Sequence, residues 1–162
     1  MATMDAMFGD DSDEEESIEV RPDDAGVLQF HNGTEEALLV YVMAHASAGD
    51  CEGILKAIDD FSYKRHWLMN MGDRKLCFLI SAVEQAKKTF SANRLNVVEL
   101  GSYCGYSAIA AGSLLRTGDQ MICVELEPQC CEWTNRMVKY AGLEGKITVV
   151  NSKASDLPAW KD

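Results

Sequence analysis

The sequence predicts an α/β fold built on a parallel sheet, and three observations support this prediction. Short apolar runs at 97–100, 121–124 and 147–150 have the length and composition of buried strands. Helical patterns separate these runs, and such an alternation of strand and helix is typical of parallel sheets. The first run is followed by two glycines, Gly101 and Gly105, at the point where a strand would turn into a helix.

Three helical patterns precede the first strand. Thr34 is placed to cap a helix that runs through Ser47, and Asp50 is placed to cap a second one. A third helix is expected to begin at Asp73. We expect His45 to be a packed or surface residue, because its spacing reveals no carboxylate partner. The residues expected on one face are Leu38, Tyr41, Val42 and His45 in the first helix, Ile54, Ala57, Ile58 and Phe61 in the second, and Leu76, Leu79, Ile80 and Val83, directed toward the sheet, in the third.

Two further helices are expected to connect the three strands. The first runs from Tyr106 to Arg116 between the first and second strands. Pro128 suits the first turn of the other helix, and Gly142 is suited to end it. The buried face of this last helix is expected to hold Trp133, Met137 and Tyr140.

The glycine turn after the first strand predicts a nucleotide-like ligand, because such ligands lie outside the carboxyl ends of parallel strands. A dinucleotide is disfavoured. Tyr103 stands where the second glycine of G-x-G-x-x-G would fall, and Glu99 places a carboxylate where it would repel a pyrophosphate. S-adenosylmethionine fits better, since it has no phosphate and carries a sulfonium and an ammonium against one carboxylate.

Glu125 completes this pattern at the end of the second strand. An acid at this position, about 20 residues beyond the glycine turn, accepts hydrogen bonds from ribose hydroxyls in βαβ nucleotide sites. The alternative is that Glu99 and Glu125 are ordinary solvated acids at strand ends.

The loop at 67–73 is the other candidate functional segment. Its tryptophan, two methionines and glycine make an adaptable surface that suits both a methyl sulfonium and an aromatic substrate. Read alone, the loop is equally compatible with a hydrophobic staple before the next helix.

Three stretches resemble the catechol O-methyltransferase family, which belongs to the class I S-adenosylmethionine-dependent methyltransferases. They are E-L-G-S-Y-C-G-Y-S at 99–107, W-L-M-N-M-G-D-R-K at 67–75 and R-M-V-K-Y-A-G-L at 136–143, and the resemblance runs over about residues 31–158. It implies a Rossmann-like methyltransferase fold, of which the chain holds only the N-terminal half, with helices and the first three parallel strands.

By this resemblance, the partial methyltransferase domain spans 31–162. It consists of a helical lid region at 34–90 and a cofactor-binding βαβαβ half at 95–155. The implied cofactor-binding residues are Met69, Asn70, Met71, Glu99, Gly101, Tyr103, Tyr106, Ser107, Glu125, Leu126, Ala154 and Ser155, and Trp67 and Met69 are implied to flank the substrate pocket. Ser107 is implied to donate to the cofactor's carboxylate. The match weakens at Ser152, Lys153 and Ser155, which partly replace the family's small residues and glutamine near the adenine.

The resemblance implies that the complete enzyme uses Mg²⁺ to transfer a methyl group from S-adenosylmethionine to a hydroxyl of a small-molecule catechol. The family's metal ligands and catalytic lysine follow the third strand, so no catalytic or metal-binding residue is assigned here. We therefore expect a truncated product or fragment that is inactive alone, and treat the resemblance of Trp160-Lys161-Asp162 to a family metal-site tripeptide as chance. Two alternatives are a catalytically inactive cofactor-binding or regulatory module, and a methyltransferase for a different acceptor.

The charge of −11 is concentrated at the N-terminus, where residues 1–24 contain ten acids and one base. Residues 1–30 are therefore expected to form a disordered acidic tail. We interpret it as a solubilising extension, and the alternatives are a protein docking segment or a switch phosphorylated at Ser12 and Ser17. The remainder has sixteen acids against fourteen bases, so no basic groove for nucleic acid is predicted.

Other features bear on location and association. We expect no signal peptide and no membrane span, because the basic start and long apolar run that define them are missing. The six cysteines lack metal-site spacing and suit reduced thiols in a cytoplasmic protein. The sequence does not predict an oligomeric state, but an unpaired edge on a three-stranded sheet is expected to cause association or poor solubility.

Overall fold

The structure is a computed structural model that describes residues 33–91 and 93–156 of the 162-residue chain. All described elements belong to the compact unit at 31–162. The acidic tail predicted at 1–30 lies outside the described residues. The elements are α1 (Thr34–His45), α2 (Cys51–Lys64), α3 (Asp73–Thr89), β1 (Asn96–Leu100), α4 (Tyr106–Leu114), β2 (Gln120–Glu125), α5 (Pro128–Tyr140), β3 (Ile147–Asn151) and the 3₁₀ turn Ala154–Asp156.

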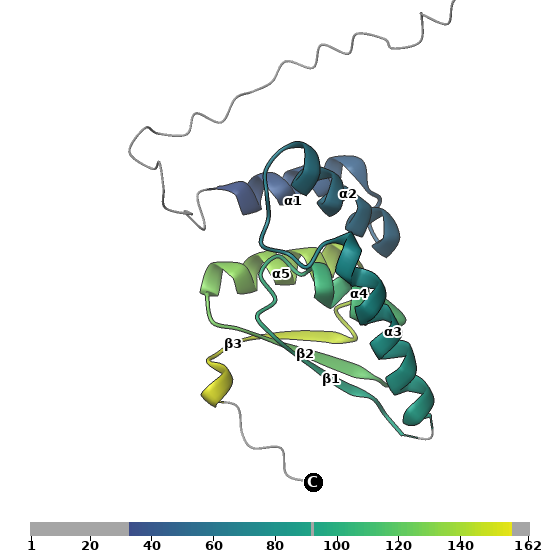
Figure 1. The fold of residues 1–162 in the computed structure, drawn as a ribbon. Helices are drawn as coiled ribbons and strands as arrows, with labels where there is room; N and C mark the ends of the chain where they lie inside the picture. Colours follow the sequence, from purple (N-terminus) through teal and green to yellow (C-terminus); the bar gives the residue numbers. More distant parts are fainter. Residues whose placement is uncertain (1–32, 92, 157–162) are drawn as a thin grey trace, which may run out of the picture. The chain divides into compact units, whose positions relative to one another are not determined.

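The three strands form a parallel sheet, as the sequence predicts, and their order in the sheet is β1-β2-β3 (Figure 1). Glu99 lies opposite Cys123, and Glu125 lies opposite Asn151. Because the strands are parallel and in this register, the carboxyl ends of β1 and β2 lie side by side. The two predicted acids therefore occupy the same end of the sheet.

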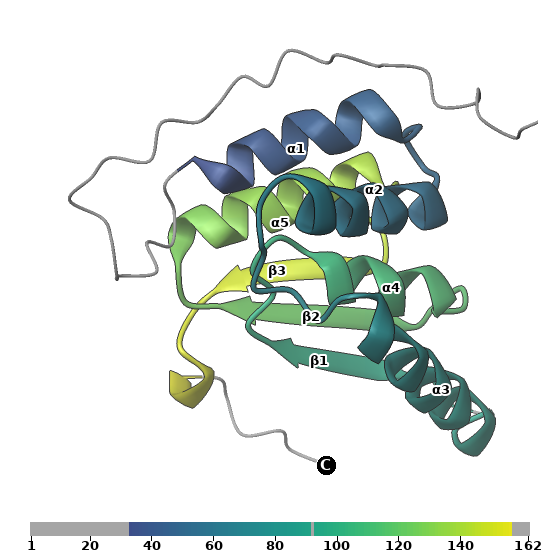
Figure 2. The same cartoon turned by 45° about the horizontal axis from the view of Figure 1, so that its top comes forward.

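Helices α4 and α5 connect the strands and pack against one face of the sheet, while α1 and α2 lie outside them (Figure 2). Gly112 allows α4 to approach β3 closely, because a Cβ at this position would overlap the Ile147 side chain. The resulting core is continuous from α1 to the sheet and includes Leu38, Ile58, Ile109, Cys123 and Met137, each at most 1% exposed. Burial of this layered core is the main stabilising contribution to the fold.

The starts of α1 and α2 differ in how well the sequence predicts them. The Asp50 cap is confirmed, since its Oδ1 accepts the backbone N–H of Gly53 at 3.0 Å. The cap predicted at Thr34 is wrong: Thr34 is the first helical residue, and the cap position is taken by Gly33 at φ +99°. Helix α1 also ends at His45 rather than Ser47, and His45 is exposed.

The faces of α1 and α2 largely follow the predicted spacing. Leu38 and Val42 of α1 are buried, whereas Tyr41 is half-buried and stacks on His45 with ring centroids 3.8 Å apart. All four residues predicted on the α2 face are buried, namely Ile54, Ala57, Ile58 and Phe61.

Helix α3 begins at Asp73 as predicted, but its packing differs from the expectation. Of its four predicted inward residues, only Val83 is buried, and Ile80 is 37% exposed. Leu76 and Leu79 are partly buried and pack against the core, and the main packing partner of α3 is α4 rather than the sheet. The helical period was correct, yet it cannot specify which element the apolar face meets.

Helices α4 and α5 show smaller differences. Helix α4 ends at Leu114, two residues before the predicted Arg116. Pro128 does open α5, and Gly142 follows its end at φ +69°. Of the face predicted for α5, Met137 is buried and Trp133 and Tyr140 are half-buried, because Cys130, Cys131, Thr134 and Val138 occupy the inner positions.

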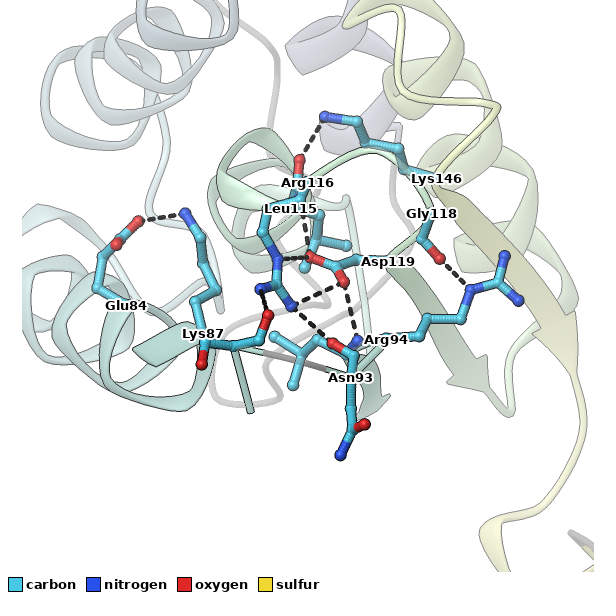
Figure 3. A network of polar contacts seen from close by, with 11 residues as sticks. Glu84, Lys87, Asn93, Arg94, Leu115, Arg116, Gly118, Asp119 and Lys146 are labelled. Carbon is cyan, nitrogen blue, oxygen red and sulfur yellow. Dashed lines mark hydrogen bonds and ion pairs between the residues drawn. The ribbon is translucent and has the colours of Figure 1, made fainter. Parts of the chain in front are cut away.

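A polar clasp, defined as Arg116 and Asp119 with the backbone groups they bind, joins the amino-terminal ends of β1 and β2 (Figure 3). The buried Asp119 carboxylate accepts the backbone N–H of Leu95 at 2.8 Å and that of Arg116 at 2.9 Å. The Arg116 side chain donates to Asp119 and to the carbonyl oxygen of Asn93 at 3.1 Å. The hydrogen bonds to the Arg116 side chain, followed by those to the backbone, hold the pKa of Asp119 well below its usual range.

None of the helices within the described residues combines the length and the apolar content that crossing a bilayer requires.

Candidate cofactor site

The turn between β1 and α4 has the backbone conformation that its glycines allow. Gly101 lies at φ +83° and donates its N–H to the carbonyl oxygen of Val124 at 2.8 Å. Gly105 lies at φ +85° and precedes the first residue of α4. Tyr103, at φ +49°, is the one described residue other than glycine with a positive φ. The left-handed conformation suits glycine because it has no Cβ, so this turn carries strain at Tyr103.

The Glu125 carboxylate holds this turn from beneath. Its Oε2 accepts the backbone N–H groups of Ser102 and Tyr103 at 2.9 and 3.0 Å, and Oε1 accepts that of Glu127 at 3.1 Å. Thr134 of α5 supports the same turn through a 2.8 Å bond from its hydroxyl to the Tyr103 carbonyl oxygen. Glu125 is only 9% exposed, so the alternative of an ordinary solvated acid is wrong for this residue.

The Glu99 carboxylate is also hydrogen-bonded to the protein rather than freely solvated. It accepts hydrogen bonds from the Ser107 hydroxyl on α4 and from the Cys123 thiol on β2, the latter at 3.3 Å. Burial raises the pKa of Glu99, and these two hydrogen bonds oppose part of that effect. A partly desolvated carboxylate of this kind is suited to receive a positively charged group.

Two tyrosines tie the site to the N-terminal helices. The Tyr103 hydroxyl donates to Glu35 of α1 at 2.9 Å, and the Tyr106 hydroxyl donates to Asp59 of α2 at 2.8 Å. Burial is the main cause of the raised pKa of both phenols, which therefore stay protonated and act as donors. Burial also raises the pKa of Asp59.

A cavity of about 270 Å³ lies between the glycine turn and the loop before α3. The structure brings seven of the predicted site residues together around it. The loop contributes Met69, Asn70 and Met71, and the turn with the start of α4 contributes Gly101, Tyr103, Tyr106 and Ser107. The turn and the loop, which are about 30 residues apart in sequence, therefore form one concave surface.

Three further lining residues were not among the predicted site residues, namely Lys75, Ser102 and Cys104. Ser102 and Cys104 lie inside the glycine motif, so the motif itself was the signal for them. Lys75 lies in the first turn of α3, and the signal for it was its place at the end of the stretch 67–75 that resembles the family.

The remaining predicted residues do not line this cavity. Glu99 and Glu125 lie beneath it through their contacts with Ser107 and with the turn. Leu126 is 65% exposed and Trp67 59% exposed. The residues predicted near the adenine, Ala154 and Ser155, lie exposed in the short turn after β3.

No group of three or more histidine, cysteine, aspartate or glutamate side chains that could hold a metal ion is found within residues 33–91 and 93–156.

The model of the O-methyltransferase family matches residues 45–158, which include the glycine turn, both acids and the loop. The chain belongs to the O-methyltransferase family. Among curated relatives, it is 34% identical over 130 residues to catechol O-methyltransferase of Bos taurus, covering 80% of this chain and 46% of that protein. It is 36% identical over 128 residues to catechol O-methyltransferase B of Danio rerio, covering 78% and 46%. The chain thus spans about half the length of these curated relatives.

A solved structure extends the similarity to the fold. The O-methyltransferase TomG of Streptomyces achromogenes, solved in complex with S-adenosylmethionine, aligns with a TM-score of 0.53 at 14% identity, covering 79% of this chain and 54% of that one. The predicted Rossmann-like methyltransferase fold is therefore confirmed, with three of its parallel strands present among the described residues.

Proposed function

We propose that this chain forms the donor-binding half of an S-adenosylmethionine-dependent O-methyltransferase. One observation carries the proposal: two buried or half-buried carboxylates, Glu99 and Glu125, flank a glycine turn that opens into a cavity. When bound, the cofactor supplies a methyl group on a positively charged sulfur. The family match and the S-adenosylmethionine bound to a protein of the same fold support this assignment.

Each wall of the site has a distinct role in this proposal. Glu125 uses three of the roughly four acceptor positions of a carboxylate on backbone N–H groups, and we assign the remaining one to a ribose hydroxyl. Glu99 attracts the cofactor's ammonium group. Met69 and Met71 cover the cofactor, because a thioether is a polarisable surface for a sulfonium.

The acceptor and the metal belong to the same proposal. The relatives named catechol O-methyltransferase support a catechol hydroxyl as the methyl acceptor, with Trp67 and Met69 flanking its pocket. We place the Mg²⁺ ligands of the complete protein outside the described residues and assign no reaction step to this chain. A cytoplasmic location is also proposed, and the six free cysteines support it because thiols stay reduced there.

The experiment that tests the donor site is a calorimetric titration of the chain with S-adenosylmethionine, using Glu125→Ala as the variant. We expect saturable binding by the wild type and binding at least about tenfold weaker in the variant, because a hydrogen bond to a charged group contributes about 1.5–3 kcal/mol. Glu132→Ala, an exposed acid on α5, removes the same charge outside the site and should bind normally.

A structural effect of Glu125→Ala can be separated from a loss of ribose contacts. Because Glu125 holds the turn, its removal should also lower the free energy of unfolding by about 1–3 kcal/mol. A cofactor analogue that lacks both ribose hydroxyls should lose less affinity in the variant than the cofactor does, because only the cofactor loses a ribose contact with Glu125. Absence of saturable binding by the wild type, or equal losses for the cofactor and the analogue, would contradict the assignment.

A further inference from the structure

The loop that forms one wall of the cavity depends on its two ends for its position. It joins the end of α2 at Lys64 to the start of α3 at Asp73. Within the part of the chain that the structure describes, no hydrogen bond involves residues 68–71, and Leu68, 2% exposed, is the one buried side chain of the loop. A segment with so few bonds of its own opens easily unless its ends are fixed.

Asp59 of α2 receives one hydrogen bond from the end of this loop and a second from the facing wall of the cavity. The backbone of Asp73, the first residue of α3, bonds to the Asp59 carboxylate. The hydroxyl of Tyr106, the first residue of α4, donates to the same carboxylate at 2.8 Å. Because residues 69–71 and Tyr106 line the cavity from its two walls, a single carboxylate connects the two walls.

The neighbouring side chains strengthen this connection. Tyr106 is only 2% exposed, and α2 packs against α4. Tyr63, one turn further along α2, donates its hydroxyl to the Asp73 side chain at 2.7 Å and so bonds the same end of the loop. A buried hydroxyl needs an acceptor, and a hydrogen bond to a carboxylate is roughly twice as strong as one to a neutral group. The connection therefore depends on the negative charge of Asp59.

The groups around Asp59 determine the pH at which this charge is lost. Burial raises its pKa, the hydrogen bonds from Tyr106 and the Asp73 backbone lower it, and the charges of Asp73 and Asp60 raise it. Tyr63 stays protonated, since its hydrogen bond to Asp73 raises its own pKa. Asp59 as a whole takes up a proton at a higher pH than an ordinary aspartate. Because both hydrogen bonds favour the ionised carboxylate, they weaken as the pH falls through this raised pKa.

We propose that Asp59 is a positioning residue of the donor site: its carboxylate holds the loop at 67–72 against the start of α4 and so slows release of the bound donor. A ligand beneath a loop leaves faster when the loop opens more often. Asp59 does not line the cavity and acts through Tyr106 and the start of α3. This inference rests on the proposed function and deepens it.

The first test measures amide hydrogen exchange of the loop in the chain without cofactor. Asp59→Asn keeps the size of the side chain but removes its charge, and should speed exchange of residues 66–72 by about three- to tenfold without affecting β1 and β2. Asp60→Asn removes the same charge at the next residue, which forms an exposed pair with Lys64, and should change neither region. The ratio of loop exchange in Asp59→Asn to that in the wild type should fall toward one in acid, because the wild type then loses the same charge.

The second test follows S-adenosylmethionine by stopped-flow tryptophan fluorescence. Asp59→Asn should raise the dissociation rate by about three- to tenfold and leave the association rate within about twofold, because most changes of affinity at one site appear in dissociation. Tyr106→Phe removes only the hydroxyl at the other end of the bond. The effects of the two substitutions on dissociation should not add in the double variant, since both break one connection.

The outcomes separate this inference from the proposed function. Faster exchange throughout the chain in Asp59→Asn would show a general loss of stability and overturn the positioning role, as would unchanged loop exchange or an equal effect of Asp60→Asn. Additive effects of Asp59→Asn and Tyr106→Phe would overturn the connection between the two walls. If the wild type binds no S-adenosylmethionine, the proposed function is overturned even where loop exchange responds as expected, so the two failures are distinguishable.

Discussion

The half-buried carboxylate of Glu99 affects the stability of the fold in a pH-dependent way. Its carboxylate is desolvated at the end of β1, and its pKa is raised mainly for that reason. An acid whose pKa is raised in the folded state holds its proton more tightly there than in the unfolded chain. Stability from this residue is therefore fully present below the ordinary glutamate range and is lost as the pH rises through the raised pKa.

Replacement of Glu99 by glutamine should remove this pH dependence. The variant has no charge to desolvate, so its free energy of unfolding should decline less than that of the wild type between pH 4 and neutral pH. Urea unfolding at several pH values measures the difference between the free energies of unfolding of the two proteins. The contributions of Asp59 and of the other titrating groups cancel in this difference, because both proteins contain them. We expect the same variant to bind S-adenosylmethionine more weakly, which is the pattern of a group retained for function. Parallel stability curves for the two proteins would contradict this account.

Three of the residues whose role depends on local chemistry were predicted correctly from the sequence, whereas the cap predicted at Thr34 was wrong. Asp50, Pro128 and Gly142 take their expected places because capping, a fixed φ and a left-handed turn are decided within a few residues. Lys75 was not predicted as a cavity residue, because its position depends on how the loop folds over a turn about 30 residues away. The position of Glu125 was predicted, but its bonds to the turn were not.

At the scale of elements, the polar clasp of Arg116 and Asp119 positions the two strands that carry the site acids. It fixes the start of β2 to the start of β1, at the opposite end of the sheet from the cavity. At the amino-terminal end of the two strands, the buried Asp119 carboxylate thus accepts the backbone N–H groups that fix their pairing. The cavity lies at the opposite, carboxyl-terminal end.

Removal of the clasp should be costly. Asp119→Ala leaves two backbone N–H groups without their acceptor, so we expect a loss of roughly 2–4 kcal/mol in the free energy of unfolding, measured by urea at pH 7. Asp60→Ala breaks the exposed pair with Lys64 and should cost less than about 0.5 kcal/mol. Because the pKa of Asp119 is lowered, its contribution is present above the ordinary aspartate range and is lost only in strong acid. Equal losses in the two variants would contradict a structural clasp.

Element types and the parallel sheet were predicted correctly, whereas no order of the strands was predicted and the main packing partner of α3 was predicted wrongly. Strands that end before Gly101 and at Glu125 can be arranged in few ways in a parallel sheet. The rules on how parallel strands are connected reduce the number of possible arrangements further. Amphipathic spacing in α3 says which side chains share a face but not what covers that face. Phe78, 73% exposed on this helix, is the clearest example of a side chain whose neighbour the sequence does not name.

At the scale of the whole molecule, the sheet exposes apolar surface at β1. Within the described strands β1 pairs only with β2, and the face opposite α4 and α5 carries Val98 and Leu100, which are 38% and 62% exposed. The other outer strand, β3, instead presents the exposed polar residues Thr148 and Asn151. Exposed apolar side chains on an outer strand form a surface on which proteins associate.

The chain is therefore expected to self-associate through β1 at micromolar concentration, as sedimentation velocity would measure. Leu100→Lys places a charge on this surface and should weaken association by at least about tenfold, because burial of a leucine side chain contributes about 1.5–3 kcal/mol. Val40 on α1 is also 62% exposed, so Val40→Lys is a matched control for adding a lysine at an apolar surface position. A wild-type chain that sediments as a single monomer and melts cooperatively would contradict the expectation, and an equal effect of Val40→Lys would move the contact away from β1. If association is confined to β1, any polypeptide that extends the sheet at this strand should compete with it, since one strand edge can pair with only one neighbour.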